Sequence, residues 1–418
     1  MMKKLLSIWG FLLLIVVTLT SCSFHPASDK ITLTLSGWQS NPNEKQLLAQ
    51  VLKTFEAEHP NIQVKHEVIN DQYMDVIKTR LIGDAAPDIF YLDAFEAPLL
   101  MKYKVLEPLN SYITEQVDIT DFEPSLLKAF QLENQTYGLP KDFSTLALFY
   151  NEKAFEEVAV TTPPKTWQEL RQTAKKLTLD KNKDGRNEQY GFGLSPDLSR
   201  QYFMMTAFGG SLVDDQGNAT FSTLSSLKGL QIIIDQYRKD KSSAQPSDLG
   251  ANSGSELFGQ GKAAMVIEGS WAVPYLKDTF PKLDFATAEI PLVGGKKGTM
   301  AYTVAYVMNK KTKHKEAAWQ LLNYLTSKEG MKSWAKEGLA LPARKSVLAE
   351  LGYEQNQLYA PFVAGSPYAT IWQAGENLPP IMLQFNNQFI SALIGEQSLQ
   401  SAMFKAQNSA NKEIQAAR

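Results

Sequence analysis

The sequence predicts an α/β protein with two domains, each built on a mostly parallel sheet covered by helices. Some segments alternate apolar with polar residues, as strands do, and others have apolar residues at helical spacing. The two kinds of segment follow one another along the chain. The chain has 418 residues, which is more than one domain of about 100–200 residues holds. Hydrophobic residues make up 44% of the sequence, so each domain can bury a core of its own.

The N-terminal segment has the layout of a secretory signal. Two lysines precede a nearly uncharged apolar run over residues 5–19, and Leu-Thr-Ser-Cys ends it at Cys22, the only cysteine of the chain. This tetrapeptide resembles the lipobox of bacterial lipoproteins. The resemblance implies a signal peptide over residues 1–21, a lipid on Cys22 that anchors the protein to a membrane, and a polar tether over 22–30. The alternative is an ordinary signal peptide or a single anchor helix.

Strands and helices begin to alternate after this tether. Strands are predicted at 31–35, 62–68 and 88–92, with helices at 44–59 and 73–82 between them. The pattern resumes with strands at 146–150 and 263–267 and helices at 167–177, 227–237 and 315–325. Parallel sheets bind ligands beyond the carboxyl ends of their strands. The loops 36–40, 70–72 and 93–96 are therefore the first places to look for a site.

Charge and residue usage exclude several classes of function. The net charge is −2 with no long run of one sign, so nothing in the sequence offers the basic surface that nucleic acid needs. The four histidines are scattered without the spacing of a metal site. With one cysteine, no disulfide can form within the chain.

Several short motifs occur in a fixed order along the chain. They are Tyr-Gly-Leu-Pro-Lys-Asp at 137–142 leading into 146–153, Pro-Lys-Thr-Trp-Gln-Glu-Leu at 164–170, Phe-Gly-Gln-Gly-Lys-Ala-Ala-Met at 258–265 leading to Gly-Ser-Trp at 269–271, and the helical segment 315–334. Together they resemble the family 1 extracellular solute-binding proteins of bacterial ABC importers, the group that includes maltodextrin-binding proteins.

The resemblance implies a periplasmic-binding-protein-like fold of two α/β lobes that close on a solute. Lobe one would hold residues 31–137 and 304–337, lobe two 143–300 and 339–418, and the hinges would lie at 138–143 and 300–303. Closure around a ligand is a hinge motion that a transporter can recognise. The protein would act outside the cytoplasm as a monomer, without enzymatic activity, and would deliver its solute to the permease subunits of an importer.

The predicted cleft carries the residue types that a sugar site needs. Sugars offer apolar ring faces to aromatic side chains, and their hydroxyls pair with carboxylates, amides and guanidinium groups. The candidates for ligand contact are Trp38, Gln39, Asp93, Asp142, Glu268, Trp271, Tyr302, Arg344 and Trp372. Each has a structural alternative, such as core packing for Trp372 or a surface ion pair between Lys141 and Asp142. Trp167, Trp319 and Trp334 lie at helical spacing and are expected in the core.

Two other functions and one metal site stay open at this point. The same fold could bind a non-sugar solute, or Asp93 and Glu268 could act as acid and base of a lipid-anchored glycoside hydrolase. A calcium loop is suggested by the oxygen-bearing side chains of Asp180, Asn182, Asp184 and Glu188. Its twelfth position, which should carry a bidentate glutamate, is a glycine. A turn without metal is therefore the alternative, and no other cofactor is expected.

Overall fold

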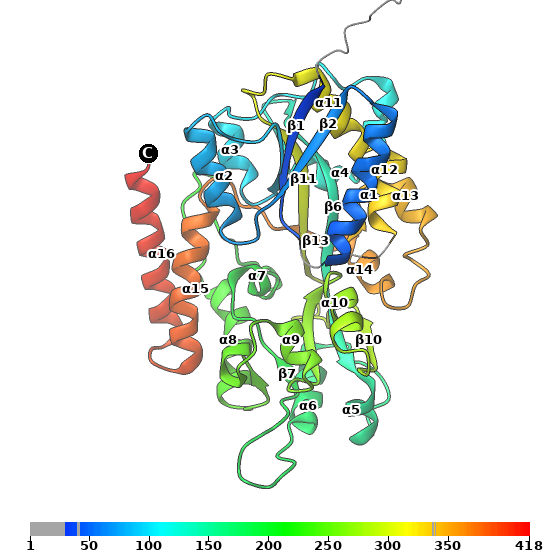
Figure 1. The fold of residues 1–418 in the computed structure, drawn as a ribbon. Coiled ribbons are helices and arrows are strands. Elements are labelled where there is room, and N and C mark those ends of the chain that lie inside the picture. Colours follow the sequence, from blue (N-terminus) through cyan, green and yellow to red (C-terminus); the bar gives the residue numbers. More distant parts are fainter. Residues whose placement is uncertain (1–29, 40–41, 337, 339) are drawn as a thin grey trace, which may run out of the picture.

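The computed structural model describes residues 30–39, 42–336, 338 and 340–418 (Figure 1). The expected signal peptide, Cys22 and nearly all of the tether lie outside these residues. In the described part of the chain, no helix combines the length and the apolar character that crossing a membrane requires.

The first half of the sheet is a parallel βαβαβ unit. Strands β1 (Ile31–Gly37), β2 (Ile62–Val68) and β3 (Ile89–Asp93) are joined by helices α1 (Pro42–Glu58) and α2 (Tyr73–Ile82). The β1 strand lies between β2 and β3 and pairs in parallel with both. These five elements confirm the sequence prediction to within a few residues at each end.

Two long strands cross from this half of the molecule to the other. They are β6 (Gly138–Asn151) and β11 (Thr299–Met308), which pair antiparallel with each other (Figure 1). The strand β11 also pairs with β3, and β6 also pairs with β9 (Met265–Gly269), both antiparallel. The strand order is therefore β2-β1-β3-β11-β6-β9-β7-β8, in which β7 is Phe192–Gly193 and β8 is Ser243–Ala244. Along this order the antiparallel pairs are β3–β11, β11–β6 and β6–β9.

The remaining strands are short and lie mostly in the second half of the chain. They are β4 (Gln131–Leu132), β5 (Gln135–Thr136), β7 (Phe192–Gly193), β8 (Ser243–Ala244), β10 (Phe285–Ala288), β12 (Leu341–Pro342) and β13 (Ala369–Ile371). The pairs β7–β8 and β7–β9 are parallel, as in the first half.

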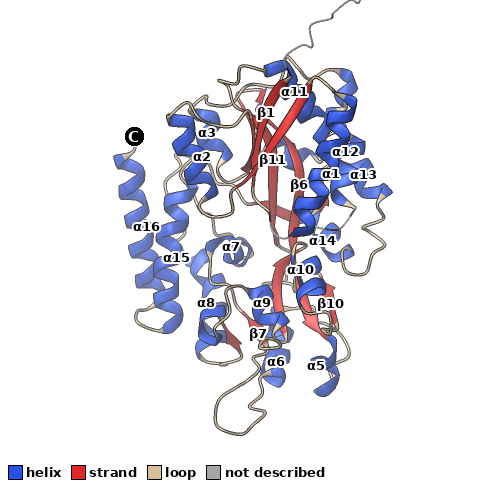
Figure 2. Cartoon of the chain, in the orientation of Figure 1, coloured by secondary structure: helices blue, strands red, loops and turns tan. Residues whose placement is uncertain are grey.

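Helices surround the sheet, which confirms the predicted α/β class (Figure 2). Those not yet named are α3 (Ala97–Lys102), α4 (Pro124–Lys128), α5 (Glu152–Glu157), α6 (Trp167–Leu177), α7 (Leu198–Thr206), α8 (Leu224–Arg238), α9 (Gly254–Gly259), α10 (Ala272–Thr279), α11 (Lys315–Leu325), α12 (Lys328–Ala335), α13 (Lys345–Glu350), α14 (Ala360–Gly365), α15 (Leu378–Ile394) and α16 (Leu399–Ala416). The C-terminal third is helical, as expected.

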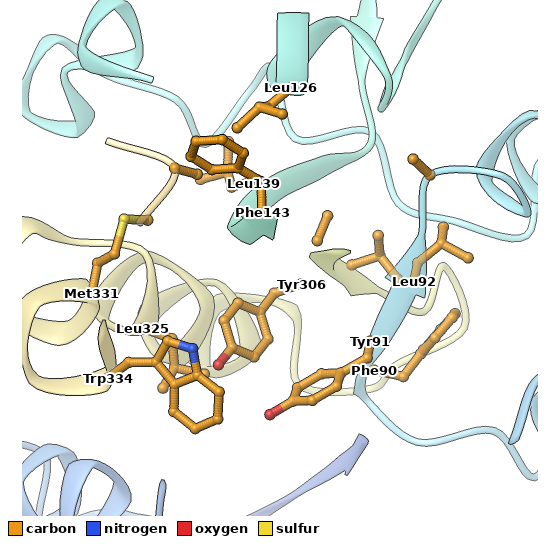
Figure 3. Packing of buried hydrophobic residues seen from close by; sticks show 14 of the residues in the cluster. Phe90, Tyr91, Leu92, Leu126, Leu139, Phe143, Tyr306, Leu325, Met331 and Trp334 are labelled. Atoms are coloured by element: carbon orange, nitrogen blue, oxygen red, sulfur yellow. The ribbon is translucent and has the colours of Figure 1, made fainter. Parts of the chain in front are cut away.

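The apolar side chains bury into two large clusters. One contains Tyr91, Tyr306 and Trp334, whose rings lie close together in Figure 3. The other contains Trp167 and Trp372 and is covered by α15 and α16. The tryptophans that the sequence assigned to the core are buried, which confirms that prediction for Trp167, Trp319 and Trp334.

Candidate functional site

A hollow of about 390 Å³ opens where the carboxyl ends of β1 and β3 face the crossing strands. Such volumes fall within the range of roughly 300–1,000 Å³ that small-molecule sites occupy. We call it the Trp334 chamber; it is lined by Trp38, Glu44, Asp93, Lys141, Asp142, Phe143, Ser144, Trp271, Tyr302, Val304, Trp334 and Ala340. Five of the nine predicted ligand residues therefore come together: Trp38, Asp93, Asp142, Trp271 and Tyr302.

Strand register explains why two carboxylates meet in this chamber. Val304 on the central strand β11 lies opposite Asp93 on one side and opposite Asp142 on the other. Neighbouring strands are about 4.8 Å apart, and residues in register point to the same face of a sheet. Asp93 and Asp142 therefore stand on either side of Val304 and face the same hollow.

A β-bulge brings Lys141 beside Asp142. Val304 pairs with Asp142, but the next residue of β11 pairs with Pro140, so Lys141 is an extra residue in its strand. Consecutive residues of a regular strand point to opposite faces, and a bulge can re-aim one of them. Lys141 forms an ion pair with Asp142. The pair suggested by the sequence is thus formed, but it is buried rather than on the surface.

Aromatic rings hold this ion pair in place. The Lys141 ammonium lies 3.9 Å from the centroid of the Trp334 ring and 4.9 Å from that of Tyr91. The indole N–H of Trp334 donates a hydrogen bond of 3.0 Å to Asp142 Oδ2. Cation–π contacts of this kind gain strength where water is excluded. The back wall of the chamber therefore contains a buried ion pair enclosed by aromatic rings.

Asp93 has a different environment. Within the described residues, no side chain or backbone amide donates a hydrogen bond to its carboxylate, and no cation forms an ion pair with it. Burial, together with the negative charges of Asp142 and Glu96, raises the pKa of Asp93 to about 7 against the opposing effect of Lys141. Near neutral pH this carboxyl group is therefore present in both protonation states.

Trp38 and Gln39 follow β1, as predicted, but only Trp38 lines the chamber. The Trp38 indole is half-buried and packs edge-on against Tyr73 and Tyr91, with ring centroids 5.0 and 5.3 Å away. The backbone N–H of Gln39 donates to Asn70 Oδ1 at 3.1 Å and joins the loops that follow β1 and β2. Its Oε1 atom is buried without a hydrogen-bond partner in the described part of the chain.

A second hollow, of about 490 Å³, adjoins the first at Trp271, which lines both. We call it the Arg200 chamber; it is lined by Ser195, Pro196, Asp197, Arg200, Pro246, Asn252, Ser253, Gly254, Ser255, Glu268, Trp271 and Tyr275. Glu268, a sixth predicted ligand residue, is in this chamber. The cleft is therefore longer than either hollow alone, and Trp271 stands at the junction.

An ion pair stabilises the wall of the Arg200 chamber. Arg200 Nη2 lies 3.3 Å from Glu268 Oε2, and Arg200 Nη1 donates to the Tyr302 hydroxyl at 2.9 Å. The guanidinium also lies over the rings of Trp271 and Tyr302, 5.5 and 5.2 Å from their centroids. Burial raises the pKa of Glu268, and the positive charge of Arg200 opposes that shift.

Sequence reasoning did not select Arg200 or Glu44. Arg200 lies on α7, just after β7, and β7 contains only two residues, too few to produce a periodic signal. The sequence Phe-Gly-Leu-Ser-Pro-Asp at 192–197 could have been recognised as a strand followed by a loop. Trp334 was assigned to the core alone, but it also lines the chamber that bears its name.

Arg344 lies outside both chambers. Its guanidinium donates to the carbonyl oxygens of Thr326, Val117 and Asp118 at 2.7, 2.8 and 3.0 Å, and it contacts Asp121 at 3.4 Å. These groups occupy its donors, so Arg344 fastens the segment before α13 to the region around residues 117–121.

Trp372 also lies outside both chambers. It is 4% exposed in the second core cluster, and its backbone N–H donates to the Ala301 carbonyl oxygen at 2.8 Å. It directly follows β13, which pairs in parallel with β11, and its side chain lines neither hollow. Trp372 therefore packs in the core, which was the alternative to ligand contact.

The acidic loop at 180–188 lies on the surface. Carboxylate oxygens of Asp180, Asp184 and Glu188 lie within 4.8 Å of one another. They also accept hydrogen bonds from backbone amides: Asp180 from residues 184 and 185, Asp184 from 186, and Glu188 from 181. The Asn182 side chain accepts from the Asp184 amide. These bonds form a turn without metal, and calcium binding stays a prediction.

A larger hollow, of about 610 Å³, lies elsewhere, between α6, α8 and the turn at 292–295. Its charged residues already pair with each other: Asp240 contacts Arg171 at 2.6 Å and Lys175 at 2.9 Å. None of the predicted ligand residues lines it. Size alone would favour this hollow, whereas the aromatic and polar groups of a sugar site gather in the two joined chambers.

Comparison with known proteins adds independent information. Residues 40–332 match the family described as "Bacterial extracellular solute-binding protein". A putative binding protein of Brucella abortus is 27% identical over 326 residues, which cover 77% of this chain and 78% of that protein.

Two solved structures share the fold. The structure of a Thermotoga lettingae solute-binding protein bound with α-D-tagatose has a TM-score of 0.80 and 26% identity, and the match covers 92% of this chain and 99% of that one. The structure of a Listeria monocytogenes ABC substrate-binding protein in complex with cycloalternan has a TM-score of 0.84 and 22% identity, with 93% and 100% coverage.

Proposed function

Because this chain belongs to the bacterial extracellular solute-binding protein family, we propose that it captures an oligosaccharide outside the cytoplasm and delivers it to the permease subunits of an ABC importer. The family consists of solute-binding proteins, so the chain is a binding protein and not an enzyme. The observation that carries the sugar proposal is Trp271, whose indole borders both chambers of one cleft.

The chemistry of the cleft supports a sugar. Trp38, Trp271 and Tyr302 supply aromatic surface for the apolar faces of sugar rings. Asp93 and Glu268 supply carboxylates, and Asn252 and Ser253 supply neutral polar groups, for hydroxyls. A non-sugar solute such as a metal chelate or phosphate ester would instead need a concentration of cationic groups. Among the described residues, the only cations lining the two chambers are Lys141 and Arg200, both paired with carboxylates.

We also propose that the cleft closes by bending at the crossing strands. The hinge positions expected from the sequence, 138–143 and 300–303, lie on β6 and β11, which pair with each other. The hydroxyl of Thr303 donates to the Asp142 carbonyl oxygen at 2.8 Å. This side-chain hydrogen bond joins the two strands in addition to their backbone hydrogen bonds. Closure would bring the loops after β1 and β3 toward Trp271 and bury the sugar.

A thermal-shift series tests the sugar proposal and the length of the ligand. We expect gluco-, galacto- or manno-oligosaccharides of three rings to bind at least tenfold more tightly than the matching monosaccharide, because one ring fills only one chamber. A ligand at 100 times its dissociation constant stabilises a protein by about 2.7 kcal/mol, which is readily measured. Recovery of the intact sugar by chromatography controls for hydrolysis. Equal affinity for one and three rings would limit binding to one chamber, and no shift with any sugar would reject the proposal.

Anchoring by lipid is proposed from the sequence alone, because Cys22 lies outside the described residues. The Cys22→Ser variant should appear in the soluble extracytoplasmic fraction, since it lacks the thiol that would be acylated. Fractionation followed by immunoblotting measures this. A variant that stays with the membrane would contradict lipid attachment at Cys22.

A further inference from the structure

Asp93 differs from the carboxylates around it because the protein supplies it with no partner. Asp142 is paired with Lys141, Glu268 with Arg200 at 3.3 Å, and Glu96 with Lys78 at 2.8 Å. Among the described residues, no cation pairs with Asp93 and no donor reaches its carboxylate. Asp93 is half-buried and lines the hollow, so its carboxylate is open to a donor or a cation of the ligand.

Asp93 gives the Trp334 chamber a negative charge that no cation of the described residues pairs with. The carboxylate of Asp142, on β6, is matched by the one ammonium of the lining, that of Lys141. A neutral hydroxyl could donate a hydrogen bond to Asp93, but it would leave the charge of Asp93 in place. A ligand cation would provide both the hydrogen bond and the compensating charge.

The aromatic residues of the cleft already hold cations. The Lys141 ammonium lies over Trp334 and Tyr91, and the Arg200 guanidinium lies over Trp271 and Tyr302. The faces of aromatic rings attract positive charge, and ammonium groups of ligands are recognised in this way. Trp38, half-buried beside Tyr91, adds another aromatic side chain to the same wall.

Resting on the sugar-binding function proposed above, we propose that the sugar ring entering the Trp334 chamber carries a primary amine, whose ammonium pairs with Asp93. The ligand would then be an amino sugar, or an oligosaccharide with an amino sugar at one end. The neutral rings of such a chain would extend past Trp271 into the Arg200 chamber, where Glu268 is already neutralised by Arg200.

The proposal predicts a dependence on pH. The groups that act on Asp93 are Asp142, Glu96 and Lys141, and the pKa of Asp93 is raised to about 7. An ammonium binds the ionised carboxylate, so affinity for an amino sugar should be low below pH 7 and rise as the pH passes through 7. A neutral sugar should show little change over this interval. The Asp93→Asn variant should lose the rise.

The experiment compares matched sugars by titration calorimetry. Glucose, galactose and mannose, alone and as the reducing or terminal ring of short oligosaccharides, are each tested in three forms: neutral, 2-amino and N-acetylated. We expect at least one 2-amino form to bind tenfold or more tightly than its neutral and N-acetylated counterparts. We also expect Asp93→Asn to abolish this preference.

Controls separate the proposal from the function on which it rests. Asp215→Asn removes a carboxylate that is exposed and lines neither chamber, so it should leave the preference intact. Melting curves of both variants verify folding. If neutral sugars bind as tightly as the 2-amino forms, or if Asp93→Asn keeps the preference, the amine proposal is overturned while sugar binding stands. If no sugar binds in any form, the function proposed above fails and the amine proposal fails with it.

Discussion

Replacing Trp271 with alanine is expected to weaken oligosaccharide binding at least tenfold, about 1.4 kcal/mol. Trp271 borders both chambers, so the substitution removes stacking surface from each. It also removes one of the two rings over which the Arg200 guanidinium lies, and the indole packs edge-on against Tyr302 at 5.7 Å. Fold stability should change little, because the indole is only partly buried. Titration calorimetry with the best oligosaccharide of the series measures the affinity.

Two further variants make the Trp271 result specific. A Cβ at Gly269 would come within 2.2 Å of the Trp271 ring, so Gly269→Ala should displace the indole without deleting it and should also weaken binding. Trp319→Phe changes a tryptophan that packs against Tyr112 away from both chambers and should leave affinity unchanged. Wild-type affinity in Trp271→Ala would remove this residue from the site.

Replacing Arg200 with methionine is expected to lower the free energy of unfolding by about 3–5 kcal/mol. The Glu268 side chain is 5% exposed, so its carboxylate would carry a buried negative charge without the cation that now pairs with it. The Tyr302 hydroxyl would lose the donor at 2.9 Å. Urea denaturation followed by circular dichroism measures the change.

A second substitution identifies the cause of that loss. In the double variant Arg200→Met with Glu268→Gln the buried charge is gone, so most of the lost stability should return.

In the single variant, the pKa of Glu268 should rise beyond its already raised position, since Arg200 no longer opposes the effect of burial. A carboxyl whose folded pKa is raised destabilises the fold as the pH rises above its unfolded value. The deficit of Arg200→Met should therefore shrink as the pH is lowered. A double variant as unstable as the single one would show that packing, not charge, is responsible.

The sequence predicted those site residues that end or follow well-marked strands. Trp38 comes directly after β1, Asp93 is the last residue of β3, and Trp271 comes just after β9. The carboxyl-end rule for parallel strands selects the loops of Trp38 and Asp93, whereas Trp271 was expected from the resemblance of Gly-Ser-Trp at 269–271 to the family's motif. Periodic apolar patterns of this length are the strongest signal that a sequence offers. The α/β class and the βαβαβ unit were predicted for the same reason.

The parts of the site that could not be predicted depend on pairing between distant segments. The bulge at Lys141 exists only in the register of β6 against β11, which are far apart in the sequence. Arg200 meets Glu268 across 68 residues, and nothing local marks that contact. Arg344 was expected at the ligand because of its residue type, whereas its guanidinium is occupied by carbonyl groups near residues 117–118 and 326. Residue type identifies chemistry, but only tertiary structure decides which partner is reached.

The most direct test is a crystal structure of the protein with the oligosaccharide that the thermal-shift series identifies. We expect sugar rings in both chambers, one on each side of the Trp271 indole, with a polar group of the ligand against the Asp93 carboxylate. Ligand density in the hollow between α6 and α8, or on the protein surface with both chambers empty, would contradict this assignment of the cleft.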